Sequence, residues 1–204
     1  HAALVCLTWG RHLFGNGDEV AATVQSGLAV LLLVPAALYA VSWLGTLHGG
    51  AIRYGTTLWY ALGAIVMLAV ATVGSLLLAT PGTAAMLGGT LFASAQFHYL
   101  AGGVLMAFLA GLHLWWPDLI GRRYDEQLGQ IGALLVFVGC NAAFAPRMLM
   151  GLRGARQGWS GPAGDLGVLS VIGGWVLLLG LGVLTVCLLS AYRDGARIET
   201  STPD

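Results

Sequence analysis

The residues of this chain best suited to chemistry are histidines that lie in or beside long apolar stretches. Within residues 89–116, His98 stands deep in an apolar run, two positions after Gln96. A histidine at such depth must find a partner, and a neutral imidazole is a common metal ligand. Residues two apart point about 200° away from each other around a helix, so Gln96 and His98 would face different neighbours. Two interpretations of His98 remain open: a metal or haem ligand, and a histidine hydrogen-bonded to a neighbouring helix.

The other histidines give weaker signals. His113 stands beside Trp115 and Trp116, which is typical of an aromatic belt at the membrane interface, so we expect an interfacial residue there. His12 lies just before the first long apolar segment, where a solvated loop histidine and a ligand are equally good interpretations. His48 has no ligand spacing to any neighbouring residue. Spacing alone therefore indicates a possible haem site and names no reaction.

The three cysteines, Cys6, Cys140 and Cys187, are isolated and lie in apolar stretches. None belongs to a CxxC pair, so the sequence indicates neither a disulfide framework nor a zinc site. We expect them to be small buried hydrophobic residues.

The composition limits the class of protein. Only 9% of the 204 residues are charged and 57% are hydrophobic, with a mean hydropathy of +0.81. A soluble domain carries about 25% charged residues, so a free cytosolic enzyme is excluded. The net charge is zero and all nine cations are arginine, which leaves no electrostatic footprint for nucleic acid. The same apolar excess excludes a disordered chain.

Membrane-spanning helices would position the histidines. A helix needs roughly 20 apolar residues to cross the hydrocarbon core, and five segments qualify. They are, approximately, residues 21–44, 56–79, 89–116, 129–152 and 166–192. We therefore predict an all-α membrane protein with one transmembrane domain over residues 1–204, because the connectors are short. The 31 glycines suit close approach between helices.

Arginine counts near the span ends give a weak orientation. One side would hold five arginines and the other four. The positive-inside rule then places the 45–55 and 117–128 loops and the C-terminus inside. The first residue is His1 and no basic segment precedes an apolar core, so no signal peptide is visible. We expect either a processed start or part of a longer chain.

Five short motifs follow one another along the chain. They are WGRHLF at 9–14, SWLGTLHGG at 42–50, FHY at 97–99, WWP at 115–117 and the stretch 139–152, GCNAAFAPRMLMGL. Their order and spacing closely resemble those of subunit I of cytochrome c oxidase, in the haem-copper oxidase family. That family reads WAHHMF, SWLATLHGG, HFHYV, WFP and GVNxTFFPxHFLGL at the corresponding places.

The resemblance implies a fold and a site. The chain would form helices eight to twelve of the family's twelve, plus the tail of the seventh. His98 would ligate a low-spin haem iron, and Phe97 would lie between the two haem positions. Arg153 and Arg156 lie close enough to the family's arginine pair, which aligns near 157–158, to hold haem propionates. The family passes electrons from the low-spin haem to a high-spin haem and copper, reduces oxygen to water and pumps protons.

Several family residues are replaced. Gln96 stands where the family has its high-spin haem ligand, and a carboxamide is a poor iron ligand. Arg11 and His12 stand where two histidines bind copper, and a guanidinium has no lone pair to donate, so copper at His12 would need ligands from elsewhere. Tyr39 replaces the lysine of a proton pathway, and residues 88–89 are glycines in place of a magnesium-binding pair.

These features predict a subunit I-like component of a cytochrome c oxidase-type respiratory complex, with oxygen reduction carried out elsewhere. The second haem ligand would come from the N-terminal half of subunit I or an equivalent chain, so this chain alone is not expected to be catalytic. Other oxidase subunits and the lipid bilayer are the further expected partners, in a bacterial-type inner (plasma) membrane. The alternative is a non-catalytic structural paralogue that binds no cofactor and scaffolds the complex. A transporter is disfavoured because the spans hold almost no charge.

Overall fold

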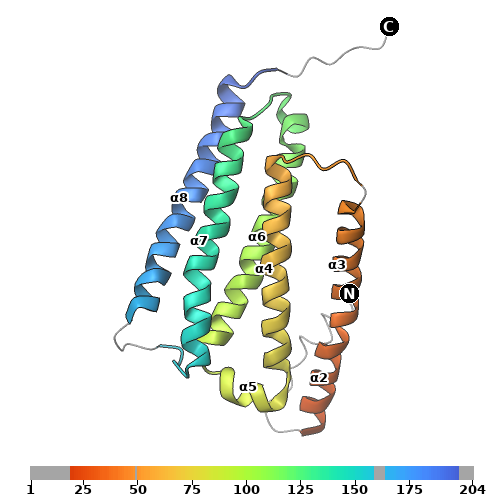
Figure 1. Cartoon of the computed structure of the whole chain (residues 1–204), viewed down its shortest axis with the longest axis vertical. Coiled ribbons are helices and arrows are strands. Elements are labelled where there is room, and N and C mark those ends of the chain that lie inside the picture. Colours follow the sequence, from red (N-terminus) through yellow and green to blue (C-terminus); the bar gives the residue numbers. More distant parts are fainter. Residues whose placement is uncertain (1–18, 49, 159–163, 198–204) are drawn as a thin grey trace.

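The computed structural model describes residues 19–48, 50–158 and 164–197, and in these ranges the chain is helical with no β-strand. Helices α4, α6, α7 and α8 run up and down beside one another, while α2 and α3 stand along one side (Figure 1). The helices are α2 (Glu19–Leu31), α3 (Leu33–Leu47), α4 (Thr56–Ala79), α5 (Pro81–Leu87), α6 (Leu91–Ile120), α7 (Glu126–Leu152) and α8 (Gly164–Asp194).

The prediction of five membrane spans is confirmed, and the chain is an integral membrane protein. Among the described residues, five helical segments are long and apolar enough to cross a bilayer. Each begins and ends within a few residues of the predicted range. The segments are Ser26–Leu47, Thr56–Ala79, Leu91–Ile120, Glu126–Leu152 and Gly164–Asp194.

The first span, predicted as one segment over 21–44, is one segment in the structure, Ser26–Leu47. Helix α2 ends at Leu31 and α3 begins at Leu33, but Leu32 between them keeps a helical backbone, and Ala36 donates its N–H to the Leu32 carbonyl at 3.3 Å. Pro35 has no N–H to donate to the Leu31 carbonyl, which accounts for this local irregularity. No residue of α3 is buried, so this span meets the rest of the described chain only weakly.

Two connectors also differ from the prediction. The short connector after residue 79 contains a helix of its own, α5, with Pro81 at its first position, where the missing N–H costs nothing. Helix α6 continues past Pro117 by one turn, beyond the predicted end at 116. It ends at Gly121, whose φ of 65° is the left-handed conformation that commonly closes a helix.

The core lies where α4, α6, α7 and α8 face one another. It contains large apolar side chains such as Met67 and Met106, and both described cysteines, Cys140 and Cys187, are buried in the bundle as free thiols. The expectation that these two are small buried hydrophobes is confirmed, whereas Cys6 lies outside the described residues. Large apolar side chains also cover the outer faces of the helices, as lipid contact requires.

Small residues bring α7 and α8 into close backbone contact. A side chain added at Gly173 would collide with the backbone at Ala142 and Ala143, and one at Gly139 would collide with the backbone of Leu177. Glycine at these positions replaces side-chain contact by backbone contact, which is how helices associate closely in lipid. The expected use of glycine for packing is confirmed at this pair of helices.

Candidate functional site

His98 lies two turns into α6, and its ring has a defined orientation. Its Nδ1 is 2.6 Å from the carbonyl oxygen of Ser94, one turn earlier. Because a carbonyl only accepts, Nδ1 must carry the proton, which leaves the Nε2 lone pair available to a metal. The ring is half-buried against Phe144 of α7, with centroids 5.2 Å apart. The Ser94 and Phe144 contacts therefore hold the ring of His98 in one orientation.

Phe97 occupies the outer side of the same turn. Its side chain is 63% exposed, and its ring meets that of His98 edge-on at 6.1 Å. The two residues thus present an apolar ring and an imidazole toward the outside of the described bundle. A planar apolar cofactor held here would need cover from elements beyond the described helices.

The arginines predicted to hold propionates lie at the same end of the bundle as His98. Arg153 and Arg156 follow the end of α7, and both are exposed with no ion-pair partner among the described residues. Backbone bonds tie their segment to the start of α6: Leu91 donates to Ala155 at 2.8 Å, and Gln157 donates to Gly89 at 3.1 Å. His98 lies seven residues after Leu91, a distance of roughly 10 Å along the helix axis.

Gln96 faces a different helix from His98, as its two-residue offset predicts. Its Nε2 donates to Ser75 Oγ at 2.6 Å and to the Ala71 carbonyl at 3.3 Å, both on α4. Its aliphatic part lies against Gly74, where a Cβ would come within 2.8 Å of Gln96 Cγ. The carboxamide is thus engaged in helix packing, and this position does not fit a high-spin haem ligand.

We expect Gln96→Ala to weaken the contact between α4 and α6. Loss of two interhelical hydrogen bonds should lower the free energy of unfolding by about 1 kcal/mol in detergent. Gln127→Ala, which removes an exposed amide from α7, is the matched control and should have no effect. Equal stability of the two variants would contradict the role assigned to Gln96.

Comparison with known proteins identifies the family. The model of the family described as Cytochrome C and Quinol oxidase polypeptide I matches residues 1–188. The chain belongs to this family. The resemblance read from the five motifs is thereby confirmed.

Curated relatives in the oxidase polypeptide I family are named cytochrome c oxidase subunit 1. The Bacillus sp. (strain PS3) protein is 29% identical over 208 residues, covering 97% of this chain and 33% of the relative. The Bacillus subtilis (strain 168) protein is 31% identical over 150 residues, covering 72% of this chain and 24% of the relative. The chain therefore matches about a quarter to a third of the length of these relatives.

A solved heme-copper terminal oxidase dimer has the same fold. The structural match covers 96% of this chain and 41% of the oxidase chain, with a TM-score of 0.72 and 16% sequence identity. The prediction of an all-α membrane fold like part of haem-copper oxidase subunit I is confirmed. Membership of the family implies haem and copper cofactors in general.

Copper ligation by His12 stays a prediction. His12 and Arg11 lie outside the described residues. Among the residues that the structure does describe, no group of three or more His, Cys, Asp or Glu could hold a metal ion. Gly88, at the family's magnesium position, follows the last residue of α5, and its N–H donates to the Ala84 carbonyl at 2.8 Å.

The sequence did not predict the burial of His113. Its place at the membrane interface stays a prediction, but its side chain is only 1% exposed and stacks on Tyr60 of α4, with centroids 4.9 Å apart. Its Nδ1 bonds the Leu109 carbonyl at 2.8 Å, and its Nε2 has no partner among the described residues. A signal was present: Tyr99, Met106 and His113 recur every seven residues, so they share one helix face, and all three are buried.

Proposed function

We propose that this chain is a subunit I-like component of a cytochrome c oxidase-type respiratory complex and contributes one axial ligand to a low-spin haem. The observation that carries the proposal is the contrast between two neighbouring positions. His98 holds a free Nε2 with its proton fixed on Nδ1, whereas the Gln96 carboxamide is bound to α4. Electron transfer is therefore retained, and oxygen reduction takes place elsewhere in the complex.

The chain's own residues supply orientation and charge. A haem, when bound, supplies one-electron redox chemistry. The Ser94 carbonyl fixes the plane and the tautomer of His98. The guanidinium groups of Arg153 and Arg156 would bind propionate carboxylates by charge-assisted hydrogen bonds.

The proposal also requires partners. A second histidine ligand would come from the N-terminal half of subunit I or from an equivalent chain, and other oxidase subunits would complete the complex. The bilayer would be a bacterial-type plasma membrane with the C-terminus inside. The Bacillus relatives, which are bacterial and named as oxidase subunits, support this assignment.

The haem content of the purified complex tests this proposal. We expect a low-spin haem with two nitrogen ligands, seen by its electron paramagnetic resonance signal in the oxidised complex. A complex that contains this chain and no low-spin haem would contradict the proposal.

The alternative is a structural paralogue that binds no cofactor and scaffolds the oxidase. The bonds that tie Gln96 to α4 favour it, because they show a position of the family's ligand set used for packing. In that case His98 is a hydrogen-bonded residue on the bundle surface. A haem lost together with His98 would eliminate this alternative.

The two arginines should tune the haem. Cations near a haem favour its reduced state, so the double variant Arg153→Gln, Arg156→Gln should lower the midpoint potential by several tens of millivolts. Spectroelectrochemical titration of the complex measures the shift. Arg193→Gln, at the other end of the bundle, is the matched control and should leave the potential unchanged. Equal midpoint potentials in the wild type, the double variant and Arg193→Gln would show that Arg153 and Arg156 do not contact the haem.

A further inference from the structure

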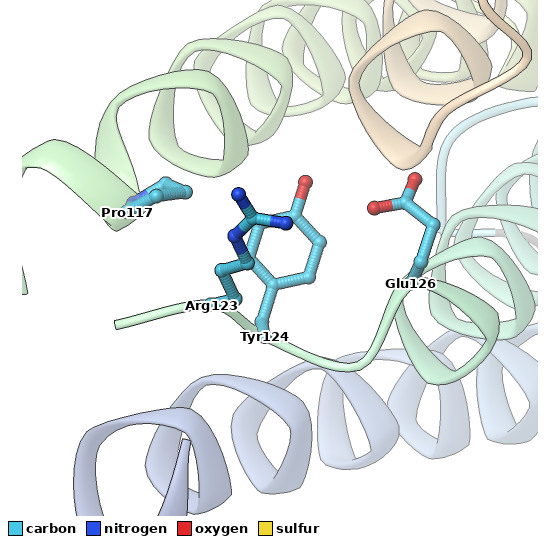
Figure 2. Close-up of a pocket in the computed structure, with 4 residues that line it drawn as sticks. All are labelled: Pro117, Arg123, Tyr124 and Glu126. Atoms are coloured by element: carbon cyan, nitrogen blue, oxygen red, sulfur yellow. The ribbon is translucent and has the colours of Figure 1, made fainter. Parts of the chain in front are cut away.

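A pocket of about 480 Å³ lies where α6 ends and α7 begins, at the opposite end of α6 from His98. Figure 2 shows the four side chains that line it: Pro117, Arg123, Tyr124 and Glu126. They come from the last turn of α6, the loop that follows it and the start of α7. The volume falls in the range of roughly 300–1,000 Å³ that is usual for small-molecule sites. None of these residues takes part in the proposed haem site.

The pocket holds two opposite charges that do not pair with each other. The Glu126 carboxylate accepts a hydrogen bond from the backbone N–H of Thr56, and the buried Thr56 hydroxyl donates to the Glu126 carbonyl at 3.1 Å. Glu126 is thereby held toward α4. The backbone N–H of Arg123 donates to Ala196 at 2.9 Å, while its guanidinium has no ion-pair partner in the described ranges. A cation and a carboxylate thus remain available in one pocket.

Tyr124 forms a neutral, fixed aromatic wall between these charges. Its ring packs edge-on against the buried His113, with centroids 5.1 Å apart and planes 88° apart. Burial, followed by the nearby charge of Glu126, raises the pKa of Tyr124, so its hydroxyl stays protonated at physiological pH.

The pocket lies at the level expected of lipid headgroups. The final turns of α6 beside it expose Trp115 by 61% and Leu119 by 71%. Exposed tryptophan is typical of the membrane–water interface. Trp115 and Leu119 lie two residues from Pro117 on either side, so they occupy the opposite face of α6 and mark the depth of the pocket without lining it.

We propose that this pocket binds a phosphoethanolamine group, with its phosphate on Arg123 and its ammonium on Glu126. An arginine guanidinium suits phosphate because it presents several N–H donors in a planar fork. A primary ammonium has three N–H donors for the carboxylate, whereas a choline group has none. A phosphate without an ammonium would leave Glu126 facing a negative charge. The group could belong to a phospholipid or to a free soluble compound.

Native mass spectrometry of the purified complex tests this proposal. The complex is released from nanodiscs made of equal amounts of phosphatidylethanolamine, phosphatidylcholine and phosphatidylglycerol with identical acyl chains. One bound phosphatidylethanolamine should be retained at least roughly fivefold over either other lipid, as a charge-assisted hydrogen bond predicts.

Two variants separate the contributions of the charges. Glu126→Gln keeps an acceptor for the Thr56 N–H but should abolish the preference for ethanolamine over choline. Arg123→Gln should weaken retention of all three lipids. The exposed residues of α8 provide charge-matched controls, Arg193→Gln and Asp194→Asn, which should retain the wild-type preference.

The source of the group is distinguished by adding O-phosphoethanolamine to the complex in phosphatidylcholine nanodiscs. Retention of this compound by the wild type and not by Arg123→Gln would show that the soluble group suffices. Retention of phosphatidylethanolamine alone would identify the lipid as the ligand. Equal retention of all lipids by the wild type, or unchanged preference in Glu126→Gln, would overturn the proposal.

Discussion

Replacing His98 with alanine should remove the low-spin haem signal from the complex. The substitution deletes the Nε2 atom of an imidazole whose tautomer is fixed by the Ser94 carbonyl. Loss of an axial ligand should reduce the low-spin α-band of the dithionite-reduced complex by at least roughly tenfold per protein. The optical spectrum and the haem-to-protein ratio measure this effect.

The matched control is His48→Ala, which removes an exposed imidazole from the residue that follows α3. Its haem content should equal that of the wild type. A low-spin band that survives unchanged in His98→Ala would show that the haem belongs to other residues. The scaffold alternative would then be favoured.

Adding a single methyl group at Gly173 should separate α7 from α8. The Cβ of Gly173→Ala would meet the backbone at Ala142 and Ala143, which cannot move aside as a flexible side chain could. Overpacking of this kind should cost roughly 1–3 kcal/mol of unfolding free energy. Unfolding of the purified protein in mixed detergent micelles, followed by circular dichroism, measures the loss.

The neighbouring glycine provides the control for this experiment. A Cβ at Gly174 would meet nothing within 4 Å, so Gly174→Ala changes the same helix without a collision. Its stability should equal or slightly exceed that of the wild type, because alanine is the better helix former. Equal destabilisation by both variants would show that α7 and α8 do not approach as closely as the structure indicates.

Much of the fold could be predicted because span length is a local property. Apolar runs of about 20 residues define membrane spans regardless of their neighbours. Local irregularities were less accessible: the helix assignment changes at Leu32, three residues before Pro35, while Pro117 lies inside α6 without ending it. The assignment of residues 1–204 to a single domain stays a prediction.

The candidate site divides in the same way between local and tertiary features. The Ser94 carbonyl lies one turn before His98, so that contact follows from helix geometry. The bond from Gln96 to Ser75 depends on how α6 packs on α4, which no spacing in one segment specifies. Burial of His113 was hidden by its tryptophan neighbours, although the helix face it shares with Met106 was readable.

An imidazole titration of the complex carrying His98→Gly tests directly whether His98 ligates the haem iron. Glycine leaves space for a free imidazole, whose N–H can still donate to the Ser94 carbonyl. We expect the low-spin α-band to be absent without imidazole and to return as imidazole is added. A band that is present without imidazole, or one that imidazole fails to restore, would contradict axial ligation by His98.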